Sequence, residues 1–590
     1  MMNGIRQYLH EILYLMGPNK KKIPYFAFLF SVASLLDLAG LGLIGPYTAL
    51  AVDLPVGSAG LERLEAWIGS GGDRKQIMIV LGMVLLCIFS IKAFAGVMIS
   101  RANIRFSQQQ GERLGQYLMG KYQGMTYVEF LNRSSNEYIQ TISSLCTVYA
   151  NMIMTSLKTL GDLIVCSAIL LLLAWQDIFA LSLLAALLGL ALFGYDWFFR
   201  RRLKRYGEEY NKSTLKIYQG VRESMEGFKE IRILGRESHF FELVKEGMQT
   251  GYKYAGKMQL ISTAPRFLLE LILIGFVVLL VIGTLASGKN LALVLPTLSM
   301  FGVASLRLLP SMNILSQSLV NIRYFRDSIS RLYQDYRMAQ AFEGSSGSQI
   351  EAVVPARFES LALEGVGFTY PSASVPSLND IHLRIAKGES IGLMGHSGSG
   401  KTTLVDVLLG LLEPQEGRIL FNGAPVKDSL ASWRGLVAYL PQNIFLIDDT
   451  LANNIALGET RIDEDRLREA LKQARLEELV NQLPQGKDTL LGEHGIRLSG
   501  GQRQRVALAR AFYHGRSVLI MDEATSALDQ ETEREIVEEI QRLKGMKTMI
   551  VIAHRLTTLR HCHHIYELRN GCLVRSGTYE EVVQRTLVPQ

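Results

Sequence analysis

The chain has 590 residues, a net charge of +7 and five cysteines. This length exceeds what one hydrophobic core usually supports, so we expect at least two domains. With 48% hydrophobic residues and a mean hydropathy of +0.17, the composition argues against an ordinary soluble protein. The scattered, odd-numbered cysteines argue against a disulfide framework and show no metal-binding spacing. The positive charge is read as basic loops beside a membrane and not as a nucleic-acid surface.

The first half of the chain carries apolar stretches that are long enough to cross a bilayer as helices. Six such spans are predicted, covering Ile23–Val52, Gln76–Ser100, Met152–Trp175, Ile178–Phe199, Met258–Ala286 and Leu291–Met312. Lys and Arg gather before the first span and after the second and fourth. The positive-inside rule therefore predicts a multi-pass protein whose N- and C-termini are both cytoplasmic.

The connections between the predicted spans differ in length on the two sides of the membrane. The inner segments Arg101–Asn151 and Arg200–Lys257 are long, polar and compatible with helix. We therefore expect spans two to five to continue as helices well beyond the bilayer. On the outer side, Leu54–Lys75 contains apolar residues at helical spacing, which predicts a short amphipathic helix at the membrane interface. An ordinary loop helix without membrane contact is the alternative.

A phosphate-binding loop lies in the second half of the chain. It follows the strand-like run Ile391–Met394 and consists of Gly395, His396, Ser397, Gly398, Ser399, Gly400, Lys401 and Thr402. A helix-compatible run begins at Thr403, which we count among the nucleotide-binding residues. Its glycines let backbone N–H groups turn toward phosphates, Lys401 reaches the β- and γ-phosphates, and the Thr402 hydroxyl ligates Mg²⁺. The pattern predicts ATP and Mg²⁺ as cofactors.

A hydrophobic strand, Val518–Asp522, leads directly into a second carboxylate, that of Glu523. Asp522 suits a direct or water-mediated contact to Mg²⁺ and to the nucleotide site. Glu523 is placed to polarise the attacking water, so we assign it as the general base. Two adjacent acids can also mark a mere strand end, but the phosphate-binding loop in the same chain argues against that reading.

The most specific pattern is a Ser-Gly-Gly turn that opens a helix. It comprises Leu498, Ser499, Gly500, Gly501 and Gln502. The N–H groups and positive dipole of such a helix start suit an anion. With this pattern in place, the chain from Phe358 to its C-terminus resembles the ATP-binding-cassette domains, whose motifs all occur here in the expected order. The resemblance implies that the turn completes the ATP site of the opposite subunit.

The same resemblance assigns roles to three further residues. Gln442 is similar to the glutamine that contacts Mg²⁺ and senses the membrane domain. His554 is similar to the histidine that holds the γ-phosphate, so it is counted with Glu523 among the catalytic residues. Tyr370 is similar to the aromatic residue that stacks on adenine.

Other segments of the chain resemble elements that connect the parts of such transporters. Ser526–Asp529 is similar to the loop that links the two ATP sites. Glu493 is similar to an exporter-type contact to the coupling helices, although His494 stands where the family usually has Arg. Tyr127–Asn132 and Gly227–Arg232 combine an aromatic anchor with charges, as docking helices on the cytoplasmic loops need. The alternative for both is a plain solvated helix.

The predicted fold class is a polytopic α-helical membrane domain of six transmembrane helices, of the exporter type, joined to an α/β P-loop ATPase domain. The predicted boundaries are 1–325 for the transmembrane domain, 326–355 for a linker and 356–590 for the ATP-binding cassette. One membrane set and one ATPase cannot complete an ATP site alone, and the sequence shows no internal repeat. Both observations predict a homodimer.

Ionisable residues inside the predicted spans are functional-site hypotheses, because each is costly in a membrane. The spans contain Asp37, Lys92, Arg266 and Arg307. The three cations fall about 24–30 Å from the outer ends of their spans at 1.5 Å per residue. This predicts a cationic belt that holds a pyrophosphate, for which arginine forks are suited. The alternative is that Arg266 and Arg307 extend to the inner headgroups.

The membrane half also resembles bacterial flippases for lipid-linked oligosaccharides. The likeness rests on Phe130–Glu137, on Lys229–Arg236, on the outer loop helix and on a first span that Gly40 and Pro46 are expected to break. It implies ATP-driven flipping of a polyprenyl-pyrophosphate-linked oligosaccharide from the inner to the outer leaflet of the bacterial inner membrane, for protein glycosylation or surface-polymer assembly. An exporter of another lipid, a drug or a peptide is the alternative. A non-transporting regulatory ATPase is disfavoured by intact ATP motifs and charged spans.

Overall fold

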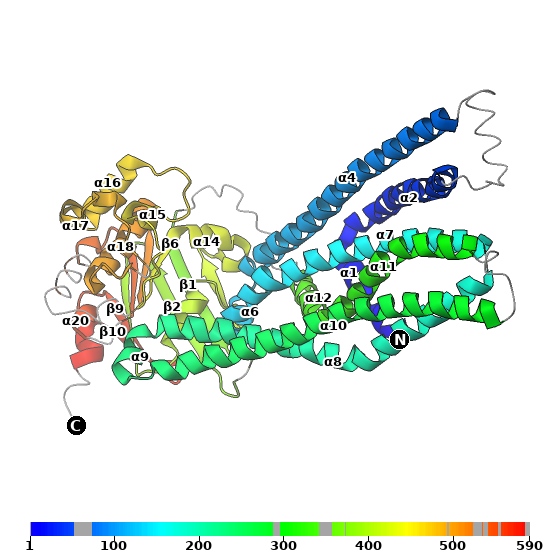
Figure 1. Ribbon diagram of the computed structural model, residues 1–590. Coiled ribbons are helices and arrows are strands. Elements are labelled where there is room, and N and C mark those ends of the chain that lie inside the picture. The colour runs from blue at the N-terminus through cyan, green and yellow to red at the C-terminus, as the bar shows by residue number, and fades with distance from the viewer. Residues whose placement is uncertain are drawn as a thin grey trace. The chain divides into compact units, whose positions relative to one another are not determined.

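The computed structural model describes residues 2–51, 74–176, 178–286, 295–341, 357–371, 373–492, 495–522, 534, 538, 541–552 and 556–584 (Figure 1). The chain divides into two compact units. The first comprises Met1–Met125 and Arg133–Ser345, and the second comprises Thr126–Asn132 and Ser346–Gln590.

The first unit consists of helices joined by short turns within its described residues. Its helices are α1 (Met2–Met16), α2 (Ile23–Ala51), α4 (Arg74–Gln123), α6 (Ser135–Gln140), α7 (Cys146–Gln176), α8 (Ile178–Glu226), α9 (Phe228–Leu234), α10 (Glu237–Ala286), α11 (Leu295–Tyr324) and α12 (Arg326–Ala341). A 3₁₀ turn, Gly17–Lys22, joins α1 to α2, and a π-helical turn, Thr141–Leu145, joins α6 to α7. The short α1 was not predicted from the sequence.

Five helices within the described residues are long and apolar enough to cross a membrane. They carry the first five predicted spans. The sixth predicted span overlaps α11, but 291–294 lie outside the described residues. The predicted outer helix, within 54–73, also lies outside them.

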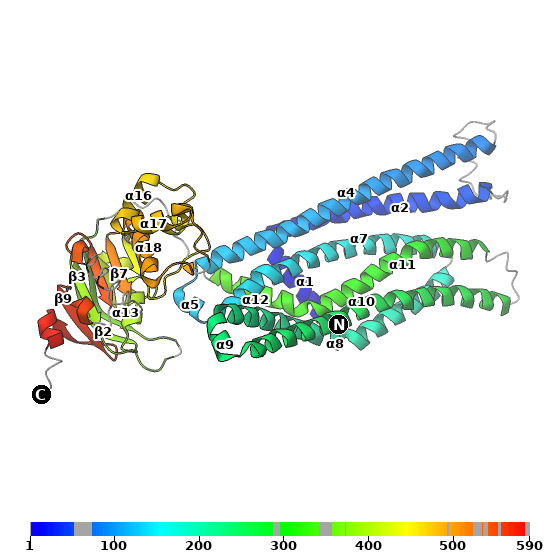
Figure 2. The same cartoon turned by 60° about the vertical axis from the view of Figure 1, so that its left-hand side comes forward.

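The helices that carry predicted spans two, four and five extend far beyond the apolar spans themselves. Helices α4 and α10 have 50 residues each and α8 has 49. At 1.5 Å per residue such helices reach about 75 Å, more than twice the thickness of a hydrocarbon core of about 30 Å. Figure 2 shows α8 and α10 side by side, with α9 at the end where they meet.

The expected break in the first span is wrong, because α2 is one continuous helix over Ile23–Ala51. Pro46 removes only one backbone hydrogen bond, and without water in the bilayer the remaining groups bond best within a helix. Gly161 of α7 instead serves close packing with α2. A Cβ atom at Gly161 would lie 2.6 Å from the Phe30 ring, so only glycine lets the two helices approach this closely.

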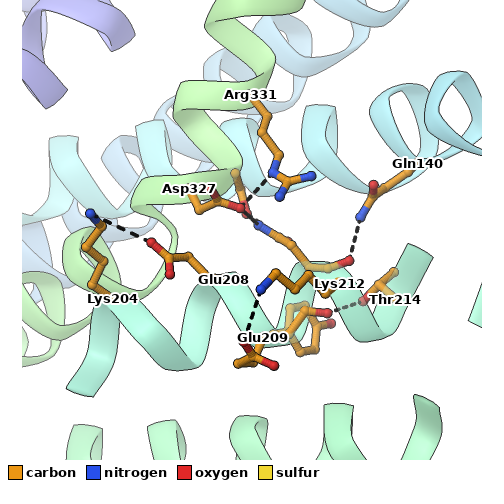
Figure 3. Close-up of polar contacts among 11 residues, drawn as sticks. Gln140, Lys204, Glu208, Glu209, Lys212, Thr214, Asp327 and Arg331 are labelled. Atoms are coloured by element: carbon orange, nitrogen blue, oxygen red, sulfur yellow. Dashed lines mark hydrogen bonds and ion pairs between the residues drawn. The ribbon is translucent and has the colours of Figure 1, made fainter. Parts of the chain in front are cut away.

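Helix α12 is held in the first unit by polar contacts (Figure 3). The side chain of Asn211 on α8 donates to Asp327 at 2.9 Å, and Asp327 also pairs with Arg331 at 2.7 Å. Gln140 of α6 donates to the backbone carbonyl of Asn211 at 3.2 Å. Arg326 forms an ion pair with Glu11 of α1, which is buried. Because Asn211 and Glu11 come from two different helices, α8 and α1, α12 is fixed within the membrane unit.

The second unit contains two sheets. An antiparallel sheet has the order β2-β1-β4-β5 and consists of β1 (Ser360–Phe368), β2 (Leu378–Ala386), β4 (Glu416–Phe421) and β5 (Ala424–Pro425). The other sheet has the order β10-β9-β3-β8-β7-β6 and consists of β3 (Ser390–Met394), β6 (Val437–Leu440), β7 (Val518–Asp522), β8 (Thr548–Ile552), β9 (His564–Arg569) and β10 (Cys572–Gly577). All of its neighbours are parallel except β9 and β10.

Helices surround these sheets. They are α5 (Tyr127–Leu131), α13 (Lys401–Leu408), α14 (Leu430–Leu436), α15 (Leu451–Ile455), α16 (Glu464–Gln473), α17 (Glu477–Gln482), α18 (Gly500–Tyr513) and α20 (Leu556–Leu559). Short turns cover Val426–Ser429, Gly486–Asp488 and Glu580–Gln584. Strand β8 is buried along its whole length, as apolar strands of a covered parallel sheet usually are.

Candidate functional site

The predicted phosphate-binding loop lies between β3 and α13, as its pattern requires. Gly395, Gly398 and Gly400 have φ values of 155°, 78° and 105°. The last two values are unfavourable for a residue with a side chain. A Cβ atom at Gly400 would also lie 2.6 Å from the carbonyl oxygen of Ser377. The glycines are therefore needed for the path of the loop.

Side chains of the loop are arranged to meet an anion. The Lys401 ammonium is buried and donates to the carbonyls of Gly395 at 2.8 Å and His396 at 2.9 Å, which holds it against the loop. Thr402, next to it at the start of α13, is exposed. The Ser399 hydroxyl is buried and has no hydrogen-bond partner among the described residues.

These features fit a nucleotide phosphate. An unpaired buried hydroxyl is costly unless a ligand supplies its partner, and the space beside Gly398 is open. Thr403 is buried within α13 and packs, whereas the exposed Thr402 is free to face solvent. Lys401 would hold the β- and γ-phosphates, and Thr402 and Gln442 would hold Mg²⁺, which supplies charge neutralisation in phosphoryl transfer.

Acidic groups meet at the carboxyl edge of the same sheet. Asp522 ends β7, and the hydroxyl of Tyr439 on β6 donates to its carboxylate at 3.2 Å. Gln442 follows β6 by two residues and is exposed. Burial, with a smaller contribution from nearby Asp522, raises the pKa of Asp406 on α13 to about 6. Asp406 was not predicted as a site residue, and its only sequence signal is an acid inside an apolar helix.

The Ser-Gly-Gly turn begins α18. Ser499 caps this helix: its hydroxyl accepts from the Gln502 backbone N–H at 3.2 Å, and the Gln502 side chain accepts from the Ser499 N–H at 2.8 Å. Leu498 and Gly501 are buried, whereas Ser499 is exposed. The remaining N–H groups of the first turn are thus presented on a rigid, outward-facing helix start, which suits an anion.

Tyr370 follows β1 and packs edge-on against Phe368, with ring centroids 5.0 Å apart. The segment Thr126–Asn132 belongs to the same unit, and Tyr127 of α5 packs with Val128 against the core cluster that includes Leu404 and Val405 of α13. Burial and the nearby Asp406 and Tyr370 raise the pKa of Tyr127. This short helix therefore reaches the surroundings of the nucleotide site.

Several predicted residues lie outside the described residues. These are Glu523, His554, Glu493, His494 and Ser526–Asp529. Their assignments stay predictions.

The predicted membrane cations differ in their surroundings. Arg266 on α10 is exposed and pairs with Glu270, one turn further on, at 3.0 Å. Lys92 on α4 is half-buried, and its ammonium lies 5.0 Å from the centre of the Phe89 ring. The side chains of Arg307 and Asp37 lie outside the described part.

Sequence reasoning missed other ionisable residues of the membrane helices. Glu270 stands four positions after Arg266, a spacing that could have revealed the pair. Asp196 of α8 forms a buried ion pair with Arg323 of α11 at 3.2 and 3.3 Å. Asp162 of α7 accepts from the Ser311 hydroxyl of α11 at 3.0 Å. The Asp196–Arg323 and Asp162–Ser311 pairs join residues that are far apart in the chain, so no local sequence pattern predicts them.

Comparison with known proteins agrees with this architecture. The family model for the ABC transporter transmembrane region matches residues 51–305, and the ABC transporter model matches residues 378–526. A curated relative, the ATP-dependent lipid A-core flippase of Hahella chejuensis, is 32% identical over 422 residues, covering 70% of this chain and 69% of the relative. The flippase of the same name from Ralstonia nicotianae is 30% identical over 511 residues, covering 84% and 82%.

A solved structure of a bacterial Atm1-family ABC exporter with ATP bound has the same fold, with a TM-score of 0.74, 23% identity and 96% coverage of both chains. The chain therefore belongs to the ATP-binding-cassette exporter family, as a half-transporter that fuses a membrane domain to an ATPase. Members of this class couple ATP hydrolysis to transport, and this chain is an ATPase of that kind.

Proposed function

We propose that two copies of this chain form a homodimer in the bacterial inner membrane, with cytoplasmic termini, and flip a glycolipid from the inner to the outer leaflet. The proposed substrate is a polyprenyl-pyrophosphate-linked oligosaccharide. ATP and Mg²⁺ bind at the loop before α13, and the turn before α18 of the other copy completes each site.

The proposed class of substrate rests on the exposure of Arg266. Its side chain is 63% exposed on a membrane-crossing helix, where an arginine is costly without a partner for its charge. Glu270 holds the guanidinium along the helix but leaves N–H groups available, because one oxygen of Glu270 meets only one nitrogen of the fork. A pyrophosphate offers several oxygens to such a fork. Lys92 and Arg307 would add charge to the same belt.

The homodimer is supported by a second exposed surface. Helix α9 presents Phe228, Ile233 and Leu234 as exposed apolar side chains, with Ile233 at 85%. Such an apolar tip on a polar cytoplasmic extension suits a docking surface. The corresponding α5 is already packed within its own ATPase unit.

The names of the curated relatives favour a second candidate, a lipid A-core glycolipid. Both candidates are glycolipids with phosphate on the headgroup, so both satisfy the chemistry of Arg266. They differ in the apolar part, which is a single polyprenyl chain in one and several acyl chains in the other.

Lipid stimulation of ATP hydrolysis tests the proposal. Purified protein in nanodiscs would receive a polyprenyl-pyrophosphate glycan, lipid A-core, or a neutral glycolipid without phosphate. We expect the phosphate-bearing polyprenyl lipid to stimulate turnover and the neutral lipid to have no effect. Arg266→Ala should abolish the stimulation and keep basal hydrolysis, whereas Glu270→Gln should lower the concentration of lipid that is needed.

Arg222→Ala is the matched control, because it removes another arginine–glutamate pair one turn apart, with Glu226, on α8. Stimulation by the neutral lipid alone, or an Arg266→Ala variant that responds like Arg222→Ala, would overturn the proposal. Stimulation only by lipid A-core would replace the proposed substrate with the second candidate.

A further inference from the structure

Helix α10 carries a proline, Pro265, in its interior. Proline has no N–H, so the carbonyl of Ile261, four residues earlier, loses its donor within the helix. In a membrane-crossing segment water does not replace that donor, and the group must be satisfied by protein.

The missing donor comes from another helix. The hydroxyl of Tyr195 on α8 donates to the Ile261 carbonyl at 2.6 Å. The Thr263 hydroxyl donates to the carbonyls of Gln259 and Leu260 at 3.1 and 3.2 Å, in the same turn. Serine and threonine bonds of this kind often bend a helix. The turn before Pro265 thus lacks one internal hydrogen bond, and the Tyr195 hydroxyl replaces it from the side.

The next residue of α8 fixes a third helix. Asp196 pairs with Arg323 of α11 through both carboxylate oxygens, and both side chains are buried. The space around Tyr195 is filled by a small apolar cluster from the same three helices, in which Leu203, Ile261 and Val320 are buried. Tyr195 and Asp196 are consecutive residues of α8, and they bind α10 and α11 at the same place on α8.

We propose that Tyr195 is a positioning residue for substrate recognition. Tyr195 donates to the Ile261 carbonyl, which Pro265 leaves without a donor. This bond fixes the path of α10 at Pro265, the residue directly before Arg266. The inference rests on the proposed function, in which Arg266 contacts the phosphate of the lipid. Without the Tyr195 hydroxyl, the turn shifts to find another donor, and Arg266 moves with it.

Tyr195→Phe removes the hydroxyl and keeps the ring in the apolar cluster. We expect the apparent KM for the polyprenyl-pyrophosphate glycan, measured by stimulation of ATP hydrolysis, to rise about fivefold to tenfold, as loss of one buried hydrogen bond implies. Basal hydrolysis should be unchanged, since the nucleotide site is untouched. Tyr206→Phe is the matched control, because Tyr206 packs on the same cluster from the same helix.

A second substitution separates positioning from general damage. Pro265→Ala returns the N–H that Ile261 lacks, so the carbonyl no longer needs Tyr195. In the Tyr195→Phe background it should lower the apparent KM back toward the wild-type value and restore the thermal midpoint in detergent. Pro265→Ala adds only one backbone donor. If Tyr195 had a merely structural role, this substitution would not restore the KM.

Two results would overturn the inference alone: a Tyr195→Phe variant with the KM of Tyr206→Phe, or a double variant whose KM does not recover. An Arg266→Ala variant with unchanged KM would overturn the proposed function and this inference with it. Running all four proteins with the same lipid therefore distinguishes the two failures.

Discussion

The guanidinium of Arg133 lies 2.8 Å from the carboxylate of Asp335, although the residues are 202 positions apart. The Thr141 hydroxyl donates to the same carboxylate at 2.8 Å, and the Tyr138 ring packs under the guanidinium, with its centre 4.8 Å away. Arg133 directly follows Thr126–Asn132, which belongs to the ATPase unit. Asp335 lies on α12, the last described helix before the ATPase sequence. One ion pair therefore joins the residue at which the chain re-enters the membrane unit to the last described helix of that unit.

Asp335→Asn should destabilise the protein strongly. It leaves the guanidinium of Arg133 largely buried, with Glu137 as its remaining carboxylate partner among the described residues, and breaking such a pair typically costs about 3–5 kcal/mol. We expect a clear fall of the thermal midpoint in detergent and weaker lipid stimulation of ATP hydrolysis. Lys245→Ala, which removes the exposed pair with Glu242, is the control and should change little. Equal midpoints for the two variants would contradict the role given to Asp335.

The two cysteines near the C-terminus should react very differently with thiol reagents. Burial raises the pKa of the Cys562 thiol to about 12, so it stays protonated at pH 8, whereas Cys572 is half-exposed. The thiolate is the reactive form. Maleimide labelling followed by peptide mass spectrometry should modify Cys572 quickly and Cys562 slowly. Because the folded pKa lies above the unfolded one, the contribution of Cys562 to stability is lost as the pH rises from about 9 toward 12. Equal labelling rates would contradict the burial of Cys562 in the apolar core that also contains Leu559 and Ile565.

Glu523→Gln should bind ATP and fail to turn it over. The substitution removes the carboxylate that orients water and leaves the phosphate-binding loop intact. Nucleotide binding by fluorescence and release of phosphate, measured on one preparation, separate the two effects. Release of phosphate near the wild-type rate would show that another group is the base.

Mixed dimers test whether each ATP site is shared between two copies. With Lys401→Ala on one chain and Ser499→Ala on the other, one composite site stays intact and about half of the hydrolysis should remain if the sites act independently. With both substitutions on the same chain, both composite sites are damaged and hydrolysis should nearly vanish. The opposite order of the two activities would mean that each chain completes its own site.

Much of the ATPase site could be predicted because its chemistry is local in sequence. A strand, a glycine loop and a helix start follow one another over residues 390–402, and the Ser499 cap is complete within four residues. The polar contacts of the membrane helices were harder to predict from the sequence. A cation inside a span indicates a free-energy cost of burying charge in the membrane. The carboxylates that neutralise such cations, such as Asp196 for Arg323, come from other helices. The continuous course of α2 was mispredicted because glycine and proline break helices in water more readily than in a bilayer.

Flipping in proteoliposomes that contain the purified protein tests the proposed transport most directly. A fluorescent polyprenyl-pyrophosphate glycan, present in both leaflets, would be followed by its accessibility to an enzyme added outside. We predict that ATP and Mg²⁺ added outside lower this accessibility, because copies whose ATPase domain faces outward move the lipid away from the leaflet on their ATPase side. Glu523→Gln and Arg266→Ala should both abolish this change, although Arg266→Ala still hydrolyses ATP. Two results would contradict the central claim: wild-type accessibility that does not change with ATP, or an Arg266→Ala variant that shows the same ATP-dependent change as the wild type.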